Sequence, residues 1–184
     1  MNSERRLAIL RVLALLVVIA ISVSVFLLRD KAQELAKYGY IGIFLLSILA
    51  NATIILPAPG FAIVFAMGSV FNPFAVALAA GAGAAIGELT GYLAGFSGQA
   101  VIEDTKGYDR VYNWMHSNRS LSFLAIFGLA AIPNPFFDFA GIAAGALRFP
   151  VWQFLFWSFL GKTVKMLFFA YAGYVSFDLF KLFK

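Results

Sequence analysis

Residues 56–60 read LPAPG and residues 132–136 read IPNPF, so a Pro-x-Pro motif occurs twice inside apolar sequence. Proline lacks a backbone N–H and clashes with the preceding helical turn, and each motif therefore interrupts a helix. The stretch from Tyr38 to Gly87 around the first motif contains no Asp, Glu, Lys or Arg. One crossing of the bilayer core needs about 20 apolar residues. The sequence therefore predicts membrane segments whose helices are interrupted at the two Pro-x-Pro motifs.

Composition places the chain among integral membrane proteins and excludes several kinds of chemistry. Of its 184 residues, 62% are hydrophobic and 12% are charged, against about 25% charged residues in soluble domains. The absence of cysteine rules out disulfides, Cys-ligated zinc and a thiol nucleophile. The single histidine, His116, lies in a polar segment, and no nucleophile motif accompanies it. We expect neither an enzyme nor a cofactor or metal site.

The net charge of +5 comes from basic residues at the ends of apolar segments. This distribution is typical of contacts with lipid headgroups and does not predict nucleic-acid binding. Arg5, Arg6 and Arg11 precede the charge-free run from Val12 to Leu28. We therefore expect an uncleaved anchor helix with a cytoplasmic N-terminus.

The two Pro-x-Pro motifs belong to an internal repeat. A shift of 76 residues, with one insertion, aligns all six prolines and one glycine of each copy. The aligned pairs are Pro57 with Pro133, Pro59 with Pro135, Gly68 with Gly145, and Pro73 with Pro150. The predicted organisation is an anchor and interfacial segment (1–37), a membrane domain (38–176) and an amphipathic tail (177–184). The membrane domain divides into repeat 1 (about 38–98), a polar loop (99–120) and repeat 2 (about 121–176).

The length of the broken segments predicts how they enter the membrane. Residues 38–72 would extend about 52 Å as one helix, which is too long for one crossing and short for two. Broken backbone survives at membrane depth only inside protein or beside a water-filled cavity. We therefore expect an all-α protein with two inverted repeats, each a re-entrant helical hairpin followed by a transmembrane helix. The predicted structural breaks are Pro57, Pro59, Gly60, Pro133 and Pro135.

Small residues recur along the segment that follows the first break. Gly83, Gly87, Gly91 and Gly95 are spaced four apart, on one face of a helix. Such faces allow membrane helices to pack backbone against backbone. We interpret them as packing positions, with no role in binding phosphate.

Four ionisable residues lie in apolar surroundings: Glu88, Asp138, Lys162 and Lys165. Ionisable groups at membrane depth indicate a functional site. For Lys162, extension of the side chain toward the headgroup layer is an equal alternative. Asp138 follows the second motif by three residues and is expected near a hairpin tip. The repeat alignment places Glu88 on Lys165, which permits a salt bridge between them.

Two longer stretches resemble the DedA or VTT-domain membrane proteins. The first comprises LPAPGFAIVFAMGSVF and GAAIGELTGYLAGFSG, and the second is IPNPFFDFAGIAAGALRFP. The resemblance covers about residues 40–175. The positions matching the family's first motif are Pro57, Pro59, Gly60, Gly83, Gly87, Glu88 (in place of Asp), Tyr92, Gly95 and Gly98.

The resemblance implies a fold of inverted repeats and movement of lipids between leaflets, with proton coupling in some members. Several family positions differ here. The arginines of the second motif map to Ala130 and Phe136, and two acidic positions of the first motif map to Leu49 and Phe61. Recognition of an anionic polyprenyl phosphate by those arginines is therefore not expected.

These observations predict translocation of an amphipathic lipid across a prokaryotic plasma membrane by a multi-pass protein. Asp138, Glu88, Lys165 and Asn134 are the residues expected to line the path. The expected partner is a membrane lipid; protons and a second copy of the chain remain open as further partners. A proton- or ion-coupled transporter of a small solute, and a non-transporting membrane scaffold, are the alternatives.

Overall fold

In the computed structural model the described residues are mostly helical and contain no strand. The predicted all-α class is thereby confirmed for this part of the chain. The structure describes residues 7–9, 11–13, 16, 38–52, 60–102, 108–133 and 137–182. Most of the predicted anchor helix, together with Pro57, Pro59, Asn134 and Pro135, lies outside these residues.

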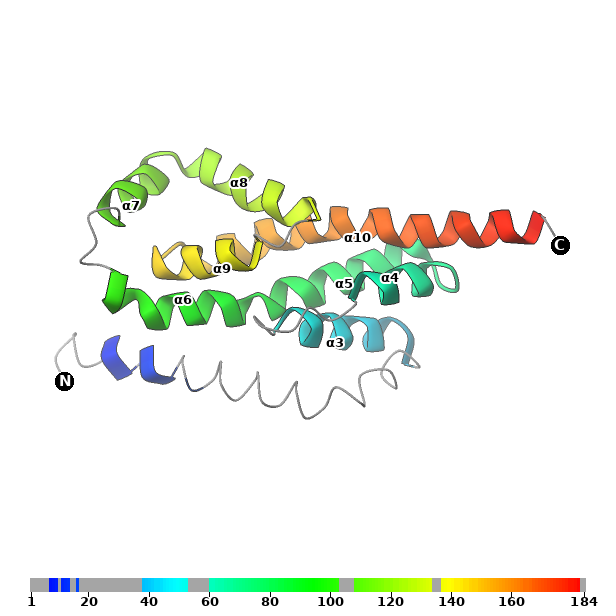
Figure 1. Cartoon of the computed structure of the whole chain (residues 1–184), viewed down its shortest axis with the longest axis horizontal. Coiled ribbons are helices and arrows are strands. Elements are labelled where there is room, and N and C mark those ends of the chain that lie inside the picture. The colour runs from blue at the N-terminus through cyan, green and yellow to red at the C-terminus, as the bar shows by residue number, and fades with distance from the viewer. Residues whose placement is uncertain are drawn as a thin grey trace.

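The helices follow one another in an order that is similar in the two halves (Figure 1). In each half, two short helices are followed by a long helical segment. The elements are α3 (Gly39–Asn51), α4 (Gly60–Gly68), α5 (Pro73–Gly87), α6 (Leu89–Ile102), α7 (Tyr108–Ser117), α8 (Arg119–Ala131), α9 (Phe137–Ala146) and α10 (Val151–Leu182).

The first long segment consists of α5 and α6, which run on from one another in Figure 1. Asn72 caps its start by accepting a hydrogen bond from the Ala75 N–H at 3.1 Å, and Pro73 occupies the first turn, where proline is favoured. Helical backbone hydrogen bonding continues across Glu88. Its N–H donates to the Ala84 carbonyl, and its backbone carbonyl accepts from the Tyr92 N–H, both at 3.1 Å. The segment from Pro73 to Gln99 is the one helix of the described residues that is long and apolar enough to cross a membrane.

The helices of the two halves pack in equivalent ways. The long helices α5 and α10 contact each other, α3 packs on α5, and α8 packs on α10. The remaining short helices cross over between the halves, because α4 packs on α10 and α9 packs on α6. Figure 1 shows α9 beside α6 at one end and α4 beside α5 and α10 at the other.

Glycines bring the crossing helices into backbone contact. A Cβ added at Gly145 of α9 would meet the Tyr92 carbonyl of α6, and one at Gly68 of α4 would meet the Ala170 carbonyl of α10. Gly68 and Gly145 are the two glycines that the repeat alignment pairs. Their helices can approach this closely only because no side chain lies between them.

At each crossing the opposite helix also contributes a glycine that lies against a backbone carbonyl. Gly95 of α6 lies against the Ile142 carbonyl of α9, and Gly173 of α10 lies against the Phe65 carbonyl of α4. The predicted packing role of the four-residue glycine spacing is confirmed at Gly95. It is also confirmed at Gly83 and Gly87, which lie against the Phe44 and Ile48 carbonyls of α3. Gly91 makes contacts only at ordinary van der Waals distances.

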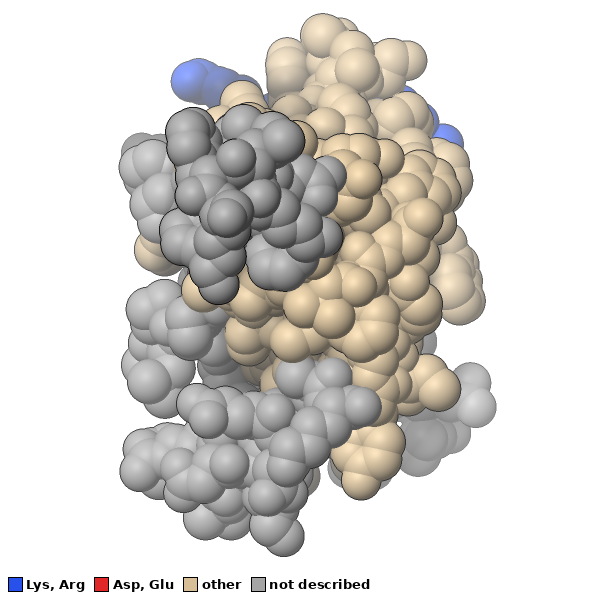
Figure 2. Space-filling model, turned by 90° about the vertical axis from the view of Figure 1, so that its right-hand side faces the viewer, with Lys and Arg blue, Asp and Glu red and all other residues tan. Residues whose placement is uncertain are grey.

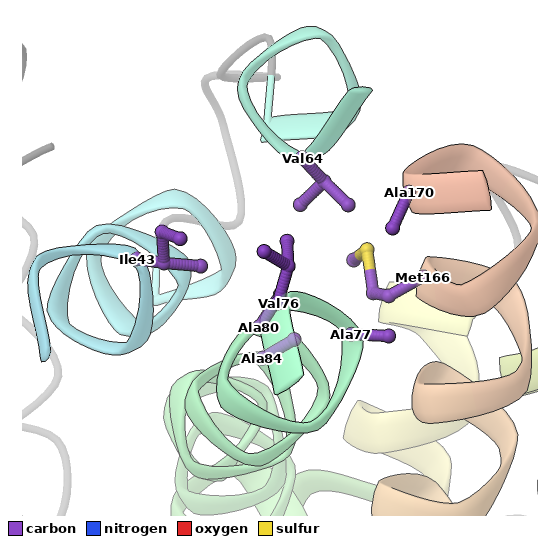
Figure 3. Packing of buried hydrophobic residues seen from close by; sticks show 8 residues of the cluster. All are labelled: Ile43, Val64, Val76, Ala77, Ala80, Ala84, Met166 and Ala170. Carbon is purple, nitrogen blue, oxygen red and sulfur yellow. The ribbon is translucent and has the colours of Figure 1, made fainter. Parts of the chain in front are cut away.

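Small and branched apolar side chains fill the centre of the first half. In Figure 3, side chains of α3, α4, α5 and α10 converge on one point. The residues of this cluster are Ile43, Val64, Val76, Ala77, Ala80, Ala84, Met166 and Ala170. A second cluster, which includes Phe137, Phe149 and Phe154, holds α8, α9 and α10 together.

The outer surface is also apolar, and this is where the protein departs from a soluble one. The exposed large apolar side chains include Phe65, Phe74, Phe139, Trp152 and Phe168. Among the described residues visible in Figure 2, Lys and Arg lie at the upper margin and uncharged residues cover the rest. Contiguous exposed apolar surface of this kind marks contact with lipid or with other protein.

One predicted segment differs from the structure. Residues 99–120, expected to be a polar loop, are largely helical, because α6 continues to Ile102 and α7 follows from Tyr108. Helix α7 is amphipathic: the half-buried Tyr112 and Met115 are three residues apart and share one face, and the opposite face carries exposed polar residues, namely Arg110, Asn113 and Ser117. Pro133 lies just after α8, Gly60 begins α4, and α10 continues into the predicted tail as far as Leu182.

Candidate functional site: a buried charged cluster at the helix junction

A salt bridge joins the two long helical segments in the interior of the molecule. Glu88 lies at the junction of α5 and α6, and Lys162 lies on α10. Each residue is 2% exposed. The Lys162 ammonium donates hydrogen bonds to Glu88 Oε1 and, at 2.6 Å, to Oδ1 of Asn51 at the end of α3. This cluster therefore ties three helical segments to one ammonium group.

Small residues around Glu88 make room for the cluster. Gly87 lets the end of α3 approach, since a Cβ at this position would lie 2.8 Å from the Asn51 Cβ. A Cβ added at Gly141 would lie 3.3 Å from Glu88 Oε2. The Thr90 hydroxyl donates to the Gly87 carbonyl at 2.9 Å, which satisfies an acceptor at the α5–α6 junction. The glycine-rich sequence around Glu88 thus holds a carboxylate inside the fold.

A second lysine, Lys165, lies one turn further along α10 and is 6% exposed. Its ammonium lies 5.4 Å from the centre of the Phe61 ring, which is a cation–π contact. Lys162 makes the corresponding contact with Phe137, at 4.8 Å. Each half of the chain therefore contributes one aromatic ring to the pair of lysines.

Asp138 lies at the edge of this cluster and not within it. It occupies the first turn of α9, and its side chain is exposed. The neighbouring Phe139 is 67% exposed, so a carboxylate and an aromatic ring are both exposed at the start of α9. Asp138 nevertheless interacts electrostatically with both Glu88 and Lys165.

Of the four residues expected to line a path, the structure brings Glu88 and Lys165 into one buried cluster and leaves Asp138 at its margin. Asn134 lies outside the described residues. Glu88 pairs with Lys162, although the repeat alignment had placed it opposite Lys165.

Sequence reasoning left two members of the cluster, Lys162 and Asn51, out of the predicted site. Two signals pointed to them. Lys162 is three residues from Lys165 and hence on the same helical face, and Asn51 is a polar residue in a charge-free stretch.

The described residues contain no group of three or more His, Cys, Asp or Glu side chains that could hold a metal ion. The cluster offers instead one carboxylate, two ammonium groups and an amide. Such groups bind charged or polar ligands and transfer protons.

Short helices packed on two long helical segments, exposed apolar side chains and a buried ion pair between the long segments are typical of a helical membrane protein with a charged interior. Residues 56–175 match the VTT domain family model. The chain belongs to the VTT domain family.

Three curated relatives are named as vacuole membrane proteins. Vacuole membrane protein KMS1 of Arabidopsis thaliana is 35% identical over 104 residues, which cover 46% of this chain and 25% of the relative. KMS2 of the same organism is 34% identical over 100 residues, covering 46% and 24%. The Vacuole membrane protein 1 homolog of Dictyostelium discoideum is 47% identical over 45 residues, covering 24% and 11%.

The aligned part of this chain thus corresponds to about a quarter of the two plant proteins. No solved structure gives a significant match to the chain.

Proposed function

We propose that the protein moves the polar headgroup of a membrane lipid from one leaflet to the other. The headgroup passes the charged cluster while the acyl chains stay in the surrounding lipid. Membership of the VTT domain family supports this function. It involves no covalent chemistry, so the residues act by exchanging hydrogen bonds and charge contacts with the headgroup.

The proposal includes an architecture of two inverted repeats with re-entrant hairpins. Helices α3 and α4 have 13 and 9 residues. At about 1.5 Å per residue they are far shorter than a hydrocarbon core of about 30 Å. Helices α8 and α9 are equally short, with 13 and 10 residues. The equivalent packing of the two sets on α5–α6 and α10 supports a relation by a pseudo-two-fold axis.

The position of Asp138 is the observation that carries the lipid assignment. A carboxylate on an apolar, outward-facing surface costs at least about 2.5–3.5 kcal/mol in the bilayer centre unless polar groups meet it there. Phe139 beside it faces outward, and Glu88 and Lys165 lie behind it within electrostatic range. A polar route that begins on the apolar surface suits a substrate whose tails remain in lipid.

The membrane and the orientation form part of the same proposal. We assign the protein to a prokaryotic plasma membrane, with the N-terminus cytoplasmic because of Arg5, Arg6 and Arg11. The relatives carry the name of a vacuole membrane, so the membrane itself needs a direct test. Localisation of the tagged protein in cells provides that test, and cysteine labelling from one side at Asn2 and Ser117 tests the orientation, because the chain has no native cysteine.

Replacing Asp138 with asparagine should abolish translocation of lipids with an amine in the headgroup. Asparagine keeps the size and the hydrogen bonds but loses the charge that attracts an amine. The measurement is dithionite quenching of a fluorescent amine-headgroup lipid in liposomes that contain the purified protein. Asp109→Asn is the matched control, because Asp109 is an exposed carboxylate on α7. Equal rates for Asp138→Asn and the active wild-type protein would remove Asp138 from the mechanism.

A further inference from the structure

We propose that Lys165 is the binding site for a phosphate group, and that the Phe61 ring covers this site when it is empty. The proposal rests on the proposed function, because it names the part of the headgroup that the charged cluster recognises. It assigns the anion-binding charge to α10, whereas the positions of the motif arginines hold Ala130 and Phe136.

The first observation is that the Lys165 ammonium has no hydrogen-bond acceptor among the residues that the structure describes. Within the described parts of the chain, the ammonium lies over the Phe61 ring, and no carboxylate, carbonyl or hydroxyl oxygen accepts a hydrogen bond from it. Lys162, one turn away, has two oxygen acceptors. A buried ammonium is costly without paired hydrogen-bond acceptors. An anionic ligand would supply the acceptors that Lys165 lacks.

The second observation is the balance of charge in the interior. Glu88 carries one negative charge, and Lys162 and Lys165 carry one positive charge each, so the three buried groups sum to +1. The carboxylate of Glu88 is already engaged by Lys162. The negative charge of Asp138 also attracts Lys165, but Asp138 is exposed and lies at the edge of the charged cluster. Lys165 is therefore the buried charge without a directly bound counter-ion, because Asp138 offsets it only from the exposed margin; the single negative charge of a phosphodiester would supply that counter-ion.

The third observation is that the Phe61 ring, which covers Lys165, lies at the protein surface. Phe61 is 41% exposed, while the lysine beneath it is nearly inaccessible. The ring stacks on Phe169 of α10 with 4.9 Å between centroids. A rotation of one partly exposed side chain in the first turn of α4 would open Lys165 to the lipid-facing surface. A phosphate ester held in the bilayer would thus reach the ammonium from the side.

Two sources supply this chemistry: the phosphodiester of a phospholipid and free inorganic phosphate. Purified full-length protein in dodecyl maltoside micelles is titrated with dihexanoyl phosphatidylglycerol, with dihexanoylglycerol, or with sodium phosphate at constant ionic strength. The readout is the thermal midpoint of intrinsic tryptophan fluorescence, which rises when a ligand binds the folded state. Phosphatidylglycerol has a phosphodiester but no amine, so the titration isolates Lys165 from Asp138.

We expect dihexanoyl phosphatidylglycerol to raise the midpoint saturably and dihexanoylglycerol to leave it unchanged. Lys165→Gln should weaken the apparent affinity about tenfold or more, because a charge-assisted hydrogen bond is lost. Lys165→Arg should retain binding, and Arg119→Gln, which removes an exposed charge, should match the wild-type protein. Sodium phosphate acting as strongly as the lipid would support the site and identify free phosphate as its ligand.

Three results would overturn the proposal: no stabilisation of the wild-type protein by either phosphate probe, equal stabilisation by dihexanoylglycerol, or wild-type affinity in Lys165→Gln. Without ligand, Lys165→Gln should be no less stable than the wild-type protein, since it removes an unpaired buried charge. A lower midpoint combined with unchanged affinity would also overturn the proposal by making Lys165 structural.

The result is separable from the proposed function. Binding that depends on Lys165 in a protein that moves no lipid would keep the site and refute translocation. Translocation that continues unchanged in Lys165→Gln would keep the function and refute the site.

Discussion

Replacing Glu88 with glutamine, or Lys162 with methionine, is expected to lower the free energy of unfolding by about 3–5 kcal/mol. Each single change leaves the partner's charge buried without its counter-ion, and both residues are 2% exposed. In Lys162→Met, Asn51 also loses the donor that lies 2.6 Å from its amide oxygen. The penalty therefore comes mainly from the charge left behind.

The double variant Glu88→Gln/Lys162→Met should recover most of this loss, because two neutral side chains of similar size replace the pair. The measurement is a double-mutant cycle on the unfolding of the purified protein in mild detergent. Arg119→Gln and Asp109→Asn provide matched controls, since each removes one exposed charge. Single and double variants whose losses simply add would show that the two residues do not interact.

The second large effect is expected at the glycines where the helices cross. Gly145→Ala and Gly68→Ala each place a methyl group against a backbone carbonyl of the opposite long helix, of Tyr92 and Ala170 respectively. A backbone atom cannot move aside as a flexible side chain does. The cost should therefore reach or exceed the about 1–3 kcal/mol of ordinary overpacking. We expect a large loss of folded protein in both variants.

Gly98→Ala and Gly128→Ala are the matched controls, because nothing lies within 4 Å of a Cβ added at either position. Both glycines are in helices, where alanine is favoured by up to about 1 kcal/mol. These controls should be neutral or stabilising. The yield of monodisperse protein and its thermal midpoint measure all four variants. Gly145→Ala behaving like Gly98→Ala would contradict the close crossing of α6 and α9.

The starts of the long helices and the sites of close helix packing could be predicted from sequence, because they depend on single residues with strong local effects. Pro73 and Pro150 immediately precede or begin the long helices, as the repeat alignment requires. The glycine spacing predicted close packing, since only glycine permits it. Helix α7 was not predicted, because its charged residues, such as Asp109 and Arg110, are also typical of a polar loop.

The pairing within the charged cluster could be predicted only in part. Glu88 and Lys165 were predicted to belong to a functional site, because a charge at membrane depth is costly. Which lysine pairs with Glu88 depends on the rotation of α10 about its axis, and a shift of three residues in sequence changes it. Asn51 joins the cluster because α3 ends beside Gly87. Such tertiary contacts leave no periodic signal in the chain.

The most direct test of the account is the rate at which the purified wild-type protein moves fluorescent phospholipid across liposome membranes. Protein-free liposomes and liposomes with an unrelated helical membrane protein are the controls. We predict that dithionite quenches amine-headgroup lipid from both leaflets in the protein-containing vesicles, and that this acceleration is lost in Asp138→Asn. Quenching that stops at the outer leaflet, in vesicles shown to contain folded wild-type protein, would contradict lipid translocation.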